Sequence, residues 1–114
     1  MILLQAVDGA WHSFRLYADA GADLTLLRAD DCRLLGYRLK AGEPVQIGGI
    51  GRGSIKAYLH RIPVRLGTVE FECQVAFSAR VRVPRLLGRS DVLTRFEICY
   101  DEVARLTRFI LRET

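Results

Sequence analysis

Apolar and polar residues alternate along much of the chain, which is typical of strands with one buried side and one solvent-facing side. The clearest case is VEFECQVAF, residues 69–77, in which every second residue up to Val75 is apolar and the residues between them are Glu or Gln. We therefore predict a half-buried antiparallel strand there.

The N-terminal residues predict a β-hairpin. Ile2–Val7 is apolar, Ala10–Tyr17 alternates, and the Asp8-Gly9 pair between them is a strong turn signal. After a short break, Leu24–Leu27 predicts a third short strand.

Glycines mark a second hairpin. From Glu43 to Leu66, two strand-like runs flank the glycines at positions 48, 49, 51 and 53. This pattern predicts a long hairpin with a glycine-rich tip. The Leu66-Gly67-Thr68 turn then leads into the strand at 69–77.

Two short stretches have helical character. RADDCRLLG, residues 28–36, predicts one to two helical turns that end at Gly36. Further on, Ser90-Asp91 is expected to be the N-cap of a short helix over Val92–Arg95.

The C-terminal residues are the most ambiguous. FEICY, residues 96–100, predicts a strand, and Asp101-Glu102 predicts a turn. The tail from Val103 onward fits both a helical stripe and strand alternation, and we favour a strand because most preceding elements are β. Many short strands with frequent turns predict an all-β fold, a small closed or partly open barrel.

Length and composition limit the domain organisation. With 114 residues, of which 50% are apolar and 26% charged, the chain predicts a single folded domain, 1–114. One core of this size leaves no room for two independent lobes. A site that needs two copies of a motif must therefore take the second copy from another chain.

Charge and cysteine content narrow the possible partners. The net charge of +4 leaves nucleic-acid binding open, but the arginines are scattered and do not alternate with aromatic residues. We therefore expect no nucleic-acid partner. The three cysteines form no C-x-x-C pair, so we expect free thiols in a reducing compartment, with no disulfide framework and no metal site.

The N-terminal residues MILLQAVDG do not resemble a secretory signal, and no run is long enough to cross a membrane. We expect a cytoplasmic chain with no membrane association in this segment. Excision from a longer precursor is equally compatible with a chain this short.

The chemistry of the chain centres on YADAGAD, residues 17–23, which places Asp19 and Gly21 between two predicted strands. Alone, this pattern is as compatible with an Asx-type turn as with a functional carboxylate. IGGIG, residues 47–51, adds backbone amides able to approach a ligand closely. It lacks the Gly-Lys-Ser/Thr ending of a phosphate loop, so a flap closing over an extended peptide fits better.

A third motif, LLGRSDVLTRF at residues 86–96, completes the set. In their order and spacing the three motifs resemble the retropepsin family of aspartic proteases, and the likeness runs from the first hairpin to FEICY. The resemblance implies a retropepsin-like acid-protease β-barrel with a flap hairpin and one short C-terminal helix, closing as a two-fold homodimer.

The resemblance also implies the site residues. Asp19 matches the catalytic aspartate, in one loop with Gly21, while Ala20 and Arg89 support that loop and Arg89 pairs with Asp23. A water held between two Asp19 carboxylates would hydrolyse a polypeptide, so no cofactor is expected. The implied substrate-binding residues are Ala22, Asp23, Ile47, Gly48, Gly49, Ile50, Gly51, Val83, Pro84 and Leu86.

The chain departs from the family pattern at Ala20, where the family has Thr or Ser. The family's hydroxyl reaches across the two-fold axis to the partner's loop, and alanine has no such donor. An alternative is therefore a catalytically impaired dimerisation or peptide-binding module with the same fold. An Arg-rich nucleic-acid-binding barrel is the least favoured alternative.

Overall fold

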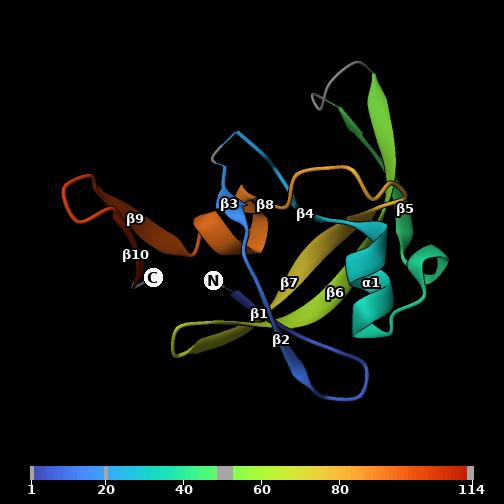
Figure 1. Cartoon of the computed structure of the whole chain (residues 1–114), viewed down its shortest axis with the longest axis horizontal. Coiled ribbons are helices and arrows are strands. Elements are labelled where there is room, and N and C mark those ends of the chain that lie inside the picture. Colours follow the sequence, from blue (N-terminus) through green and yellow to red (C-terminus); the bar gives the residue numbers. More distant parts are fainter. Residues whose placement is uncertain (1, 20, 49–52, 113–114) are drawn as a thin grey trace.

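The computed structural model describes residues 2–19, 21–48 and 53–112. Eight strands form one strongly curled sheet in the order β2-β1-β6-β7-β4-β8-β3, with β5 paired to β6, and a separate two-stranded sheet contains β9 and β10 (Figure 1). The strands are β1 (Ile2–Gln5), β2 (Trp11–Phe14), β3 (Tyr17–Ala18), β4 (Thr25–Leu27), β5 (Glu43–Gly48), β6 (Ser54–Leu66), β7 (Val69–Ser78), β8 (Leu86–Leu87), β9 (Phe96–Asp101) and β10 (Leu106–Leu111).

Both predicted hairpins are confirmed as secondary structure. Strands β1 and β2 pair antiparallel from Ile2 opposite Phe14 to Gln5 opposite Trp11. Strands β5 and β6 pair from Glu43 opposite Leu59 to Gly48 opposite Ser54. The predicted tip residues Gly49, Ile50 and Gly51 lie outside the described residues.

The longest ladder joins β6 to β7, from Ala57 opposite Ser78 to Leu66 opposite Val69. In β7, Phe71, Cys73 and Val75 are buried while Glu70 and Glu72 are exposed, so the predicted half-buried strand is confirmed. The buried side chains of β7 meet those of β1, β4 and β6 in the main core, whose largest fully buried members are Phe77, Leu4, Leu27, Leu35, Ile62, Val64 and Val75.

The first predicted helix is α1 (Ala29–Leu35), and it ends at Gly36 as expected. Gly36 has φ +82°, and its amide donates to the carbonyl of Arg33. An unpredicted 3-10 turn, η1 (Leu39–Ala41), follows and leads into β5.

The second predicted helix needs a correction. The segment η2 (Arg89–Leu93) follows Gly88 at its N-cap and is interrupted by non-helical backbone at Ser90 and Asp91. No side chain caps it, so the expected Ser90-Asp91 cap is wrong. Asp91 has φ +66°, and its carboxylate accepts a hydrogen bond from the amide of Gln74 on β7 (2.9 Å). That tertiary bond holds Asp91 in a left-handed conformation, which sequence rules for caps do not anticipate.

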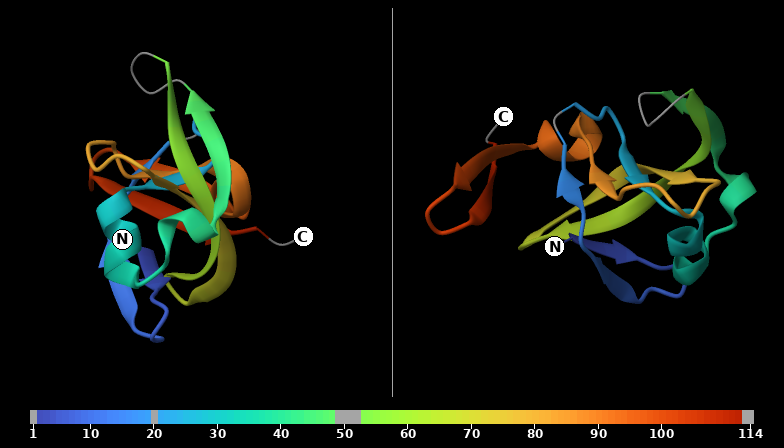
Figure 2. Two further views of the ribbon diagram at one scale, coloured as in Figure 1. Left: turned by 90° about the vertical axis from the view of Figure 1, so that its right-hand side faces the viewer. Right: turned by 45° about the horizontal axis from the view of Figure 1, so that its top comes forward.

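The ambiguous tail is a strand, as favoured from the sequence. Strands β9 and β10 pair antiparallel from Phe96 opposite Leu111 to Asp101 opposite Leu106. Figure 2 shows that this hairpin and the β5–β6 hairpin extend from opposite ends of the molecule, with the other strands of the curled sheet between them.

Candidate active site

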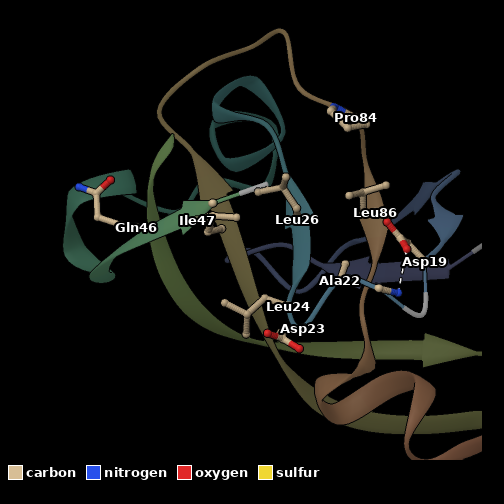
Figure 3. A pocket seen from close by; sticks show the side chains of 11 residues that line it. Asp19, Ala22, Asp23, Leu24, Leu26, Gln46, Ile47, Pro84 and Leu86 are labelled. Carbon is tan, nitrogen blue, oxygen red and sulfur yellow. Dashed lines mark hydrogen bonds between the residues drawn. The ribbon is translucent and has the colours of Figure 1, made fainter. Parts of the chain in front are cut away.

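Asp19 directly follows β3, in a turn built from its own backbone and carboxylate. Its amide donates to the carbonyl of Leu87 (3.0 Å), which joins the turn to the last residue of β8. The Asp19 Oδ1 atom accepts from the amide of Gly21 (2.9 Å; Figure 3), and the Asp19 carbonyl accepts from the amide of Ala22 (3.0 Å). Two backbone hydrogen bonds therefore fix the turn, and the bond from the Gly21 amide orients the half-buried carboxylate.

The segment after this turn is held by the start of η2. The amides of Arg89 and Ser90 donate to the carbonyls of Ala22 and Asp23, respectively, and both N–O distances are 2.9 Å. The Arg89 guanidinium also donates to Asp23 Oδ1 (2.6 Å). Both side chains are more than half exposed, so this ion pair adds little free energy, and the backbone bonds do most of the positioning.

A close backbone contact underlies this arrangement. A Cβ atom on Gly88 would lie 2.3 Å from the carbonyl carbon of Leu24, so only glycine fits there. The Gly88 amide donates to the hydroxyl of Thr25, which is 1% exposed (3.1 Å). The LLGR motif therefore contains glycine because the chain after β8 packs directly on the strand that follows the Asp19 turn.

The Asp19 turn opens into a cleft of about 590 Å³, a size suited to a peptide side chain and its neighbours. Figure 3 shows Ile47 of β5 across the cleft from Leu86 of β8 and from Asp19. The cleft is lined by Asp19, Gly21, Ala22, Asp23, Leu24, Leu26, Gln46, Ile47, Gly48, Pro84 and Leu86. The carboxylates of Asp19 and Asp23 thus lie beside apolar side chains in a cleft of mixed lining.

Most of the site residues inferred from the sequence come together here, since eight of them line the cleft: Asp19, Gly21, Ala22, Asp23, Ile47, Gly48, Pro84 and Leu86. Val83 is 3% exposed and packs beneath the wall in a second buried cluster with Leu26 and Ile55, so it supports the cleft without lining it. Ala20, Gly49, Ile50 and Gly51 lie outside the described residues.

Sequence reasoning missed three lining residues, Leu24, Leu26 and Gln46, and two positioning residues, Thr25 and Gly88. Leu24 and Leu26 carried a signal, because residues at i and i+2 of a strand share one face. Thr25 carried none, since a hydroxyl in an apolar run shows its role only when its hydrogen-bond partner, here the Gly88 amide, is known.

The buried thiols of Cys32 and Cys73 do not line the cleft. Burial raises the pKa of the Cys73 thiol to about 12 and that of Cys32 to about 11, so both stay protonated at neutral pH. Within residues 2–19, 21–48 and 53–112, no three His, Cys, Asp or Glu side chains cluster as metal ligands. Among the same residues, no helix is long and apolar enough to cross a membrane.

Solved structures define the class of fold. The chain matches a retropepsin-like aspartic protease from Rickettsia conorii with a TM-score of 0.62 and 23% identity, covering 90% of this chain and 84% of that one. It matches the EIAV protease, solved with an inhibitor, with a TM-score of 0.56 and 21% identity over 77% of each chain. The fold is therefore that of the retropepsin-like aspartic proteases, as the resemblance in the sequence implied.

Two curated relatives match the sequence itself. The UBA domain-containing protein Mud1 of Schizosaccharomyces pombe is 28% identical over 92 residues, 79% of this chain and 27% of that protein. The DNA damage-inducible protein 1 of Yarrowia lipolytica is 27% identical over 88 residues, 75% of this chain and 22% of that protein. The chain thus spans about a quarter of their length. No family model matches the chain.

Proposed function

We propose that this chain is one half of a homodimeric aspartic endopeptidase with Asp19 as its catalytic carboxylate. The observation that carries the proposal is the position of Asp19, whose carboxylate is oriented by the Gly21 amide and faces a cleft of about 590 Å³. A carboxylate beside the apolar lining residues Leu24, Ile47 and Leu86 suits attack on a peptide bond whose neighbouring side chains are apolar.

The chemistry requires a second carboxylate. The ionised Asp19 would accept a proton from water as the water oxygen bonds to the peptide carbonyl carbon, while a protonated second aspartic acid gives its proton to the carbonyl oxygen. When the tetrahedral diol collapses, the C–N bond breaks, the amine takes up the first proton, and a diol hydroxyl returns a proton to the second aspartate. The chain has one such motif, so Asp19 of a second copy is the partner.

The β9–β10 hairpin is the surface we assign to that second copy. Its exposed side chains include five large apolar ones, Tyr100, Val103, Leu106, Ile110 and Leu111, beside charged residues such as Arg105 and Arg108. A two-stranded hairpin is marginally stable in water by itself, and this one pairs with no strand of the main sheet in the described part of the chain. Two copies joined there would cover the apolar side chains of both.

The β5–β6 hairpin is proposed as the flap. Ile47 and Gly48, at the end of β5, line the cleft and lead directly into the glycine-rich positions 49–51. Backbone amides at Gly49, Ile50 and Gly51 would donate to the carbonyl groups of an extended peptide. The substrate is then an unstructured polypeptide held by its backbone, with apolar side chains in the cleft.

Cleavage of an unstructured protein between pH 4 and 6 tests the proposal, because one proton stays on the carboxylate pair at acidic pH. We expect cleavage by the wild type, inhibition by a statine-containing peptide, and no cleavage by Asp19→Asn. The control is Asp30→Asn, which neutralises an exposed aspartate on α1. Cleavage that survives Asp19→Asn would refute the assignment.

The alternative is a peptide-binding or dimerisation module with the same fold. It is supported by Ala20, which lacks the hydroxyl found in the family. This alternative predicts binding of a statine-containing peptide with no turnover at any pH. Turnover by the wild type would exclude it.

A further inference from the structure

The loop between β7 and β8, residues 79–85, carries one wall of the cleft and is fastened to the first turn of α1. The Arg28 side chain donates through Nε to the carbonyl of Val83 (2.7 Å). The Ala29 amide donates to the carbonyl of Arg80 (3.4 Å). The loop is thus attached at two carbonyls to the helix N-terminus.

A buried carboxylate makes the strongest of these attachments. The Asp31 side chain is only 4% exposed. The Arg85 guanidinium donates to both of its carboxylate oxygens, and each N–O distance is 2.9 Å. Asp31 Oδ2 also accepts from the amide of Arg28 (3.0 Å). A bidentate ion pair of this kind restricts the orientation of the guanidinium as well as its distance from the carboxylate, so it fixes where the Arg85 backbone lies.

The backbone of Arg85 is directly connected to the candidate active site. Its carbonyl accepts from the amide of Tyr17, at the start of β3 and two residues before Asp19 (3.0 Å). Its neighbours Pro84 and Leu86 both line the cleft. Neither Asp31 nor Arg85 lines it, so their influence on a bound peptide passes through the wall residues.

We propose that Asp31 and Arg85 are positioning residues that set the substrate affinity of the cleft by fixing the wall formed by Pro84 and Leu86. This inference rests on the proposed peptidase function for its kinetic consequence. The ion pair holds the loop from outside the cleft, and the Asp19 turn has its own hydrogen bonds to Gly21 and Leu87. Loosening the pair should therefore weaken peptide binding more than it slows the chemical step.

Steady-state kinetics on an apolar model peptide tests whether the pair affects peptide binding more than the chemical step. Asp31→Asn and Arg85→Lys are each expected to raise KM about tenfold with kcat within about twofold, since each loses a charge-assisted hydrogen bond. Arg85→Lys keeps both charges and so covers the case in which Asp31→Asn fails to fold. The matched control is Glu72→Gln, which breaks an exposed ion pair to Arg61 of the same 2.9 Å length and should leave KM unchanged.

A second measurement separates this proposal from the peptidase assignment. Amide hydrogen exchange of residues 15–19 and 79–87 should be faster in Arg85→Lys than in Glu72→Gln, and the affinity for a statine-containing peptide should fall about tenfold. If the wild type cleaves nothing, the peptidase assignment fails while these two readouts still support positioning. Unchanged exchange and affinity in folded Arg85→Lys, or an equal fall in kcat and kcat/KM, would overturn the positioning role.

Discussion

Gly88 packs against the backbone of Leu24 so closely that a Cβ atom on Gly88 would lie 2.3 Å from the Leu24 carbonyl carbon. Because this contact is with backbone, the neighbour cannot move aside by changing a rotamer. The contact joins the chain entering η2 to the strand that follows the Asp19 turn, and so links two of the three sequence motifs.

We expect Gly88→Ala to lower the free energy of unfolding by about 3 kcal/mol, as overpacking against backbone does. Denaturant unfolding would measure this. Gly48→Ala is the control, since nothing lies within 4 Å of a Cβ there and its stability should change little. Equal stability of the two variants would contradict the close contact.

Arg89→Ala is expected to lower the free energy of unfolding by only about 0.5 kcal/mol. The ion pair to Asp23 is short, but both side chains are more than half exposed. Thermal unfolding would check this, with Arg61→Ala at another exposed pair as the control. A loss above about 2 kcal/mol would mean that the guanidinium, and not the Arg89 and Ser90 amides, holds the loop.

Stability should decrease as the pH rises above about 9. Burial raises the pKa of Cys73 from 9.0 to about 12 and that of Cys32 to about 11. In the unfolded chain these thiols ionise near pH 9, whereas in the folded chain they remain protonated, so their contribution is complete below pH 9 and is lost toward pH 11 to 12.

Urea unfolding between pH 8 and 11 would measure this slope. Cys73→Ala should flatten it, although the variant is less stable overall because it loses a buried side chain. Cys99→Ala, which replaces a half-exposed thiol, should retain the slope. An identical slope in both variants would show that Cys73 ionises equally in the two states.

Ile110→Lys should weaken self-association at least tenfold while the fold is retained, because this β10 side chain is 48% exposed in the single chain. Sedimentation velocity would measure association, and circular dichroism would check the fold. Leu34→Lys on α1 is the matched control, at 59% exposure, and should leave association unchanged. Undiminished association of Ile110→Lys would place the dimer interface elsewhere.

Ala20→Thr should raise kcat/KM by roughly ten- to a hundredfold. In the proposed homodimer, the added hydroxyl would supply the hydrogen bond between the two loops that the resemblance implies for Thr or Ser at this position, worth about 1 to 2 kcal/mol per site. Ala20→Val adds similar volume without a donor and serves as the control. Equal kcat/KM values for Ala20→Thr and Ala20→Val would show that side-chain volume at position 20, and not a hydrogen bond, limits activity.

Much of this architecture follows from local sequence. Alternation located the strand at 69–77, Asp8-Gly9 located the first hairpin, and Gly36 located the end of α1, because each depends on residues within a few positions. The order of three short motifs was enough to indicate the fold and to group eight of the residues that line the cleft.

Contacts distant in sequence were decided only by the tertiary structure. The left-handed Asp91 depends on Gln74, the close fit of Gly88 depends on Leu24, and the Asp31–Arg85 pair joins residues 54 positions apart. The tail from Val103 onward fitted two periodicities, and the pairing of β10 with β9 selected the strand. Sequence periodicity reports which face of an element is buried, but the partner on that face is chosen by packing across the whole chain.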